Sequence, residues 1–159
     1  VYMVTTTRAQ ECEIHGVTYR PVTVTEQKFF GSQPTAVGTN QVNISSIEKT
    51  LVDCADHPEF CGGIGELAKA MQNAVDMRCS WERVIEYLRR VRNGAATKRI
   101  VYIADQLNID LPEYSSVVEN FTTGYPLLDP TRKAKGTRDS KYQLRLNVSP
   151  ESFLPEDNS

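Results

Sequence analysis

Hydrophobic residues recur at two different spacings along this chain, and the change of spacing separates a strand-rich first part from a helical second part. Before residue 45, β-branched and aromatic residues are frequent, which is typical of strands. We expect strands over residues 1–7 and 13–25, the latter with a turn or bulge at His15-Gly16 and a bend at Pro21. A hairpin is expected over residues 35–44, with its turn at Gly38-Thr39-Asn40.

Helical spacing begins within residues 45–67, the stretch around which the rest of the chain is organised. Ser45 and Glu48 have the spacing of a capping box, so we expect a helix to begin there. Pro58 prevents that helix from continuing, and Gly62-Gly63 permits backbone angles that side chains disfavour. Apolar residues form one stripe on each side of this break: Ile47, Leu51, Val52 and Ala55, then Ile64, Leu67, Ala68, Met71 and Val75. The pattern predicts two short helices joined by a rigid corner.

Further helices are predicted downstream of the corner. They run from Ser80 to a stop at Asn93-Gly94, over residues 97–107, and from Pro112. Residues 131–140 are polar, basic and aperiodic, which indicates an exposed loop. Hydrophobic and polar residues alternate over 142–148, so we expect a strand that returns to the N-terminal sheet. The predicted fold class is α+β: a small mixed β-sheet from N-terminal strands plus a C-terminal strand, packed against about five helices.

The length of 159 residues favours one domain, expected over residues 1–150, followed by a flexible acidic tail over residues 151–159. Because the sequence begins at Val1, we expect it to be a fragment of a longer protein. Mean hydropathy is -0.41, and the sequence has neither a membrane-length apolar run nor a secretory leader. The four cysteines form no closely spaced pair. These features predict a soluble cytoplasmic protein with no membrane partner.

The net charge of -2 conceals an uneven distribution. Residues 1–77 carry a net charge of -4, residues 78–145 carry +5, and residues 146–159 carry -3. A basic middle section attracts phosphate groups, although cations near helix ends also satisfy backbone carbonyls. We expect nucleic-acid contacts, to phosphates rather than bases, from Arg89, Arg90, Lys98, Arg99, Arg132, Lys133, Lys135, Arg138 and Lys141. No aromatic residue interleaves with the charges of the predicted loop, which argues against stacking of single-stranded bases.

Three residues at the corner are candidate metal ligands. Cys54, His57 and Cys61 have spacings of three and four residues, which would place them on one face of a helix. Pro58 breaks that helix, and structural zinc sites favour tighter paired spacings. We therefore expect no metal and no cofactor.

A metal-dependent nuclease-like domain is the alternative enzymatic interpretation. Glu26, at a predicted strand end, and either Glu13 or Glu11, on or near the preceding strand, would hold a divalent cation, and Lys28 would lie near the attacking water. Because Glu-x-Lys is a common tripeptide, a solvated strand end is the better explanation of these residues. The leading expectation is a chain with no catalytic residues.

The corner also carries a family resemblance. Ile47-Glu48-Lys49-Thr50-Leu51-Val52-Asp53, followed by His57-Pro58-Glu59-Phe60-Cys61-Gly62-Gly63-Ile64, resembles the signature of AbiEi-type antitoxins, with Lys49 where family members usually have Arg. Two other parts of the chain match as well. They are Trp81-Glu82-Arg83, which opens a helix ending near Arg92-Asn93, and Leu128-Asp129-Pro130-Thr131 with residues 142–148. Together these segments carry the resemblance across residues 1–150.

The resemblance implies a non-enzymatic transcriptional regulator, the antitoxin half of a bacterial type IV toxin–antitoxin system. In such repressors a winged-helix module precedes this domain and binds promoter DNA, so the sequence corresponds to the C-terminal antitoxin domain alone. The implied functional partner is a nucleotidyltransferase-like toxin. A module that dimerises, or docks a partner through Phe29-Phe30, is a third interpretation. Since no recognition helix is evident, we expect this chain to bind DNA weakly, salt-sensitively and without sequence preference.

Overall fold

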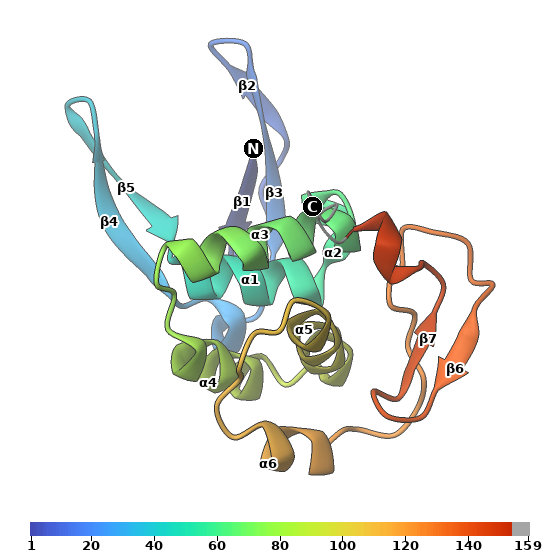
Figure 1. Ribbon diagram of the computed structural model, residues 1–159. Coiled ribbons are helices and arrows are strands. Elements are labelled where there is room, and N and C mark those ends of the chain that lie inside the picture. Colours follow the sequence, from blue (N-terminus) through green and yellow to red (C-terminus); the bar gives the residue numbers. More distant parts are fainter. Residues whose placement is uncertain (154–159) are drawn as a thin grey trace, which may run out of the picture. The chain divides into compact units, whose positions relative to one another are not determined.

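The computed structural model describes residues 1–153 and has an α+β fold (Figure 1). The chain divides into two compact units, Val1–Ser45 and a second unit that begins at Ser46. The first unit contains strands and one short 3-10 helix, whereas the second contains all six α-helices of the described residues and one small hairpin. No helix among residues 1–153 combines the length and the apolar character needed to cross a membrane.

The first unit begins with a three-stranded sheet of order β1-β3-β2. Its strands are β1 (Tyr2–Thr5), β2 (Cys12–Ile14) and β3 (Val17–Thr23). β1 pairs with β3 in parallel, and β2 pairs with β3 antiparallel. His15 and Gly16 have φ of 51° and 76°, as a tight hairpin turn requires. The segment predicted over 13–25 is therefore divided at this turn rather than at Pro21, which lies inside β3 opposite Met3.

A hairpin completes the first unit, as predicted. After the 3-10 helix η1 (Glu26–Lys28), β4 (Ser32–Val37) pairs antiparallel with β5 (Asn40–Ser45). The turn contains Gly38, whose φ of 60° suits glycine. No residue in 1–45 is buried, so this unit has no hydrophobic core of its own.

The second unit is built around a helix that is buried on nearly all sides. Its helices are α1 (Ile47–Asp56), α2 (Pro58–Cys61), α3 (Ile64–Asp76), α4 (Trp81–Val91), α5 (Gly94–Gln106) and α6 (Tyr114–Glu119). Every residue from 98 to 104 of α5 is buried, and α1 and α6 pack against this helix. The predicted corner is present: Pro58 opens α2, and Gly62 and Gly63 have φ of 97° and 95°.

Two predicted helix ends need correction. Ser46, not Ser45, caps α1 by accepting a bond from the Lys49 N–H at 3.2 Å. The expected stop at Asn93-Gly94 is a start instead, since Asn93 caps α5 and Gly94 is its first residue. Arg92 terminates α4 with φ of 58°, a conformation that sequence propensity assigns to glycine or asparagine.

The predicted sheet was wrong in its C-terminal strand. β7 (Leu144–Leu146) pairs antiparallel with β6 (Thr137–Asp139), and this hairpin forms its own sheet rather than joining the N-terminal strands. β6 lies within the segment predicted as a loop. β7 instead packs against α5, where Leu144 is fully buried. Alternation correctly indicated a strand with one buried face, but alternation does not identify the pairing partner.

The expected acidic tail begins with residues that have a defined position. Ser152 ends the 3-10 helix η2 (Pro150–Ser152). Phe153 is buried, and the centroid of its ring is 6.4 Å from that of the Tyr102 ring. The remaining residues, 154–159, lie outside the described residues.

Candidate functional site

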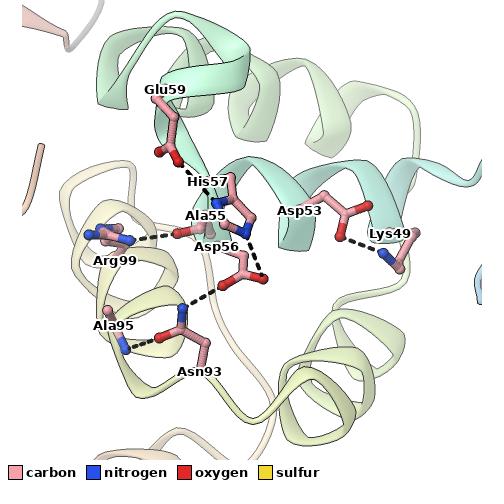
Figure 2. Close-up of polar contacts among 9 residues, drawn as sticks. All are labelled: Lys49, Asp53, Ala55, Asp56, His57, Glu59, Asn93, Ala95 and Arg99. Carbon is pink, nitrogen blue, oxygen red and sulfur yellow. Dashed lines mark hydrogen bonds and ion pairs between the residues drawn. The ribbon is translucent and has the colours of Figure 1, made fainter. Parts of the chain in front are cut away.

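Polar side chains meet where the C-terminus of α1 approaches the N-terminus of α5 (Figure 2). The buried Asp56 carboxylate accepts a hydrogen bond from the Asn93 amide. The other end of that amide accepts from the Ala95 N–H at 2.9 Å and so caps α5. Because Asp56 orients the capping amide, the end of one helix determines the start of another.

His57 lies at the edge of the same cluster. Its Nε2 is 3.6 Å from Asp56 Oδ2, and its Nδ1 is 3.0 Å from Glu59 Oε1. Burial acts to raise the pKa of Glu59, but the hydrogen bond from His57 and the backbone N–H lower it overall. His57 thus bridges two carboxylates across the break between α1 and α2, and its ring also stacks on Phe60.

Arg99 is the central cation of the corner. It is buried in α5 and donates from Nη1 to the Ala55 carbonyl at 2.9 Å, a group of the last turn of α1. Its other nitrogens donate to the carbonyls of Leu127 and Leu128 at 3.0 and 3.1 Å. Burial lowers the pKa of Arg99, yet guanidinium stays protonated, so a permanent positive charge faces the negative end of α1.

Lys98 is also buried, and it too connects α5 to backbone carbonyls. Its ammonium donates to the carbonyls of Thr122 and Gly124 at 2.6 and 2.8 Å. The prediction that Lys98 and Arg99 contact phosphate on the surface is therefore wrong. The sequence places two cations at the start of a helix, but burial of that helix turns both of them toward backbone carbonyls.

Asp129 connects the C-terminal part of the unit to the corner. Its Oδ2 accepts from the Ile64 N–H at 3.2 Å, at the N-terminus of α3, and its Oδ1 accepts from Thr131 at 2.6 and 2.9 Å. The Asn147 side-chain oxygen accepts from the Asp129 N–H at 2.9 Å, and the Asn147 side-chain nitrogen donates to the Asp129 carbonyl at 2.7 Å. A Cβ on Gly63 would lie 2.9 Å from Asp129 Oδ2, so only glycine fits this close approach.

The segments that carry the family resemblance therefore meet through hydrogen bonds that are buried or partly buried. We call Asp56, Asn93, Arg99, Asp129 and Asn147, with their partners, the corner network. Its members come from four segments that are widely separated in sequence. Among residues 1–153, no buried side-chain nitrogen or oxygen lacks a hydrogen-bond partner. Within the part of the chain that the structure describes, each buried side-chain nitrogen or oxygen of the corner network therefore has a hydrogen-bond partner.

A second contact involves Glu48, which was predicted to cap its own helix. Glu48 Oε1 accepts from the Ser80 N–H at 3.3 Å and lies 4.0 Å from Arg83 Nη1. Burial acts to raise the pKa of Glu48, but hydrogen bonds with its own N–H, with the Ser46 side chain and with the Ser80 N–H, together with the nearby guanidinium, lower it overall. The carboxylate of α1 therefore supports the start of α4.

Two other predicted cations are held by carboxylates. Arg89 makes a bidentate pair with Glu113, at 2.6 and 3.2 Å, which raises the pKa of the arginine. Lys141 donates to Asp105 at 2.8 Å, and this bond raises the pKa of the lysine. Both side chains stay exposed, but each already forms an ion pair with a carboxylate. Arg90 is exposed on α4.

The remaining predicted residues form a continuous exposed stretch, which we call the basic segment: Arg132, Lys133, Lys135 and Arg138. No carboxylate within residues 1–153 forms an ion pair with any of these four side chains. The backbone beneath them is anchored, because Asn147 donates to the Lys133 carbonyl at 3.1 Å. The basic segment therefore presents four cations from a positioned main chain.

An aromatic residue does lie beside the basic segment. The Arg138 guanidinium lies over the Tyr125 ring, 5.4 Å from its centroid. Tyr125 is 37 % exposed and precedes Arg138 by 13 residues, so inspection of the predicted loop alone missed it. The contact is a cation–π interaction that restricts where the guanidinium can point.

The structure offers no support for the nuclease interpretation. Glu13 lies on β2, whereas Glu26 and Lys28 lie in η1. Within residues 1–153, no three His, Cys, Asp or Glu side chains gather closely enough to hold a metal ion. The trio of Cys54, His57 and Cys61 is included in that result.

Comparisons with known proteins return nothing that matches this chain: neither a family model, nor a curated protein, nor a solved structure.

Proposed function

We propose that this chain is a non-enzymatic regulatory domain of the AbiEi antitoxin type, which contacts the phosphate backbone of nucleic acid through its basic segment. The single observation that supports the phosphate contact is that the four cations of the basic segment are available to a ligand. They are exposed and make no ion pair with a carboxylate of residues 1–153. Such groups release condensed counterions when they bind phosphates, which favours binding at low salt.

The corner network supports the regulatory part of the proposal. Residues that resemble the family signature serve as connectors between helices: Asp129 receives the Ile64 N–H, and Asn93 joins Asp56. A signature made of connectors is what a scaffold domain needs, whereas an enzyme signature would include side chains directed into a cleft. In this proposal promoter DNA is bound mainly by a winged-helix module of a longer protein, and a nucleotidyltransferase-like toxin is the functional partner.

Fluorescence anisotropy with a labelled duplex, over a series of salt concentrations, tests the phosphate contact. We expect a Kd in the range of about 10⁻⁴–10⁻⁶ M at physiological salt, with little dependence on sequence. In the test variant all four cations are neutralised: Arg132→Gln, Lys133→Gln, Lys135→Gln and Arg138→Gln. Each lost contact should reduce the slope of log K against log salt by about 0.9.

A matched control removes the same charge elsewhere. It combines four substitutions of exposed residues: Arg8→Gln, Lys69→Gln, Arg78→Gln and Arg92→Gln. If attraction is due to net charge alone, the two variants will lose affinity equally, and the basic segment will have no special role. Tight, salt-resistant binding by the unmodified chain would also contradict the proposal, since it would require base contacts.

A further inference from the structure

Two cysteines face each other across the break between α1 and α2. Cys54 lies in the last turn of α1, and Cys61 is the last residue of α2. The Cys61 sulfur is 4.0 Å from the Cys54 carbonyl oxygen, 3.4 Å from that of Pro58 and 3.7 Å from that of Gly63. Both cysteines are free and partly exposed, so the pair is neither oxidised nor sealed in the core.

The Cys61 thiol reaches the Cys54 carbonyl, and the interaction between the two side chains changes the pKa of the two thiols in opposite directions. The hydrogen bond from Cys54 is the main cause that lowers the pKa of Cys61, and it outweighs burial, which acts in the other direction. The same bond, together with burial, raises the pKa of Cys54. Asp53, beside Cys54, raises its pKa further. One sulfur is therefore favoured as the thiolate nucleophile, and its neighbour keeps its proton.

We propose that Cys54 and Cys61 are a peroxide-sensitive dithiol that closes to a disulfide across the corner. In the first step the Cys61 thiolate attacks one oxygen of hydrogen peroxide. A sulfur–oxygen bond forms, the oxygen–oxygen bond breaks, and the departing hydroxide takes a proton from solvent and becomes water. Cys61 is then a sulfenic acid.

In the second step the sulfur of Cys54 attacks the sulfur of Cys61. The sulfur–sulfur bond forms, the sulfur–oxygen bond breaks, and the departing hydroxide combines with the Cys54 proton as a second water. Two thiols have lost two electrons in total, and one peroxide has been reduced to two waters. No metal or cofactor takes part.

The disulfide would fix a specific part of the fold. It would tie the last turn of α1, which presents the Ala55 carbonyl to Arg99, to α2 and the Gly62-Gly63 turn. The corner network converges on this break. Oxidation therefore acts on the scaffold rather than on the basic segment, and this inference is independent of the proposed function.

Peptide mapping of the full chain after treatment with stoichiometric hydrogen peroxide tests the proposal. No Lys or Arg lies between the two cysteines, so trypsin leaves both on the peptide of residues 50–69. We expect that peptide to lose two hydrogen atoms, to resist alkylation, and to regain both thiols with dithiothreitol. Glu59 lies between them, so a glutamate-specific protease should produce two fragments joined only by the disulfide.

The other cysteines are internal controls. Burial raises the pKa of Cys79 to about 11, so it should remain alkylatable under the same treatment. Cys12 is exposed and reports how far a lone surface thiol is oxidised. If Cys54 and Cys61 stay reduced while Cys12 reacts, or if they pair with cysteines of other chains, the proposal is wrong.

Single substitutions assign the order of the steps. With Cys54→Ser, Cys61 should stop at the sulfenic acid, which a cyclic 1,3-dione traps as a stable adduct on the 50–69 peptide. With Cys61→Ser, Cys54 should give little adduct, because burial and the nearby Asp53 carboxylate still raise the pKa of its thiol. Equal trapping in the two variants would overturn the assignment of Cys61 as the nucleophile. Circular dichroism of the untreated variants establishes that both remain folded.

Discussion

The corner network and the basic segment are both rich in charge, yet they use it in opposite ways. Arg99 is 5 % exposed, and its guanidinium is occupied by backbone carbonyls of two distant segments. Arg132 is exposed, and no carboxylate of the described residues pairs with it. The same side chain is thus a connector in one place and a surface charge in the other. What distinguishes the two positions is the hydrophobic pattern around each cation.

That pattern is visible in α5. Ile100, Val101, Ile103 and Ala104 are all fully buried, which leaves no solvated face over residues 98–104 of the helix. Charged residues at the start of such a helix must find partners inside, and the free carbonyls at a neighbouring helix end are suitable acceptors. Around the basic segment there is no apolar periodicity, so its cations remain in water.

The largest effect is expected from replacing the buried Arg99 by methionine, and the same replacement of the exposed Arg132 is the comparison. Arg99→Met should lower the free energy of unfolding by about 3–5 kcal/mol, because the carbonyls of Ala55, Leu127 and Leu128 would lose their donor while remaining buried. Arg132→Met should change it by no more than about 0.5 kcal/mol. Urea unfolding followed by circular dichroism measures both. Equal stability of the two variants would show that the buried guanidinium is dispensable.

A smaller effect is expected where the corner network meets α3. Gly63→Ala should destabilise by about 2–3 kcal/mol, because its φ is 95° and the new Cβ would lie 2.9 Å from Asp129 Oδ2. Gly124→Ala is the matched control, since its φ is 98° but no atom lies within 4 Å of a built Cβ. It should cost about 1 kcal/mol from backbone strain alone. Thermal unfolding of the two variants separates the clash from the strain; identical losses would mean that the contact with Asp129 is unimportant.

Asp105 allows the contrast to be tested with pH. Its Oδ2 accepts from Tyr114, Lys141 and Tyr142 at 2.7, 2.8 and 2.8 Å. Burial acts to raise the pKa of Asp105, but these bonds lower it below the ordinary 3.8. The carboxylate therefore stabilises the fold above pH 3.8, and this contribution is lost as pH falls through the lower folded-state pKa.

Asp105→Asn should accordingly lower the free energy of unfolding at neutral pH by about 1–2 kcal/mol, since an amide is a weaker acceptor than a charged carboxylate. The difference from the unmodified chain should shrink as pH is lowered below 3.8. Unfolding curves at several pH values give this comparison. A difference that does not change with pH would mean that the charge of Asp105 is not what makes its hydrogen bonds with Tyr114, Lys141 and Tyr142 stabilising.

The sequence predicted most elements of the fold because their signals are local. The Gly38 turn and the break at Pro58 each depend on neighbouring residues, and both are present. The apolar stripe of α3 is present at Ile64, Leu67, Ala68 and Met71, but Ala74 is buried where Val75 was predicted, and Val75 is exposed. Ser45 and Ser46 are both good capping residues, so sequence alone could not choose between them. The pairing of β7 is a long-range property that its own alternation does not contain.

The candidate site was predictable only in part, for a related reason. Exposure of the basic segment follows from its local composition. The contact of Asp129 with Ile64 spans 65 residues, and the pairing of Asn93 with Asp56 spans 37, so neither has a signature in sequence spacing. A helix with apolar residues on every face was the one available sign that Lys98 and Arg99 are buried.

The smallest expected effect concerns the aromatic residue beside the basic segment. Tyr125→Ala removes the ring beneath Arg138, a surface cation–π contact of about 0.5–1 kcal/mol, and should leave the unfolding curve nearly unchanged. If the basic segment binds phosphates alone, affinity for duplex and for single-stranded DNA should fall equally and slightly. Tyr125→Phe keeps the ring and should restore both. A large loss confined to single strands would instead show that the exposed ring stacks on bases.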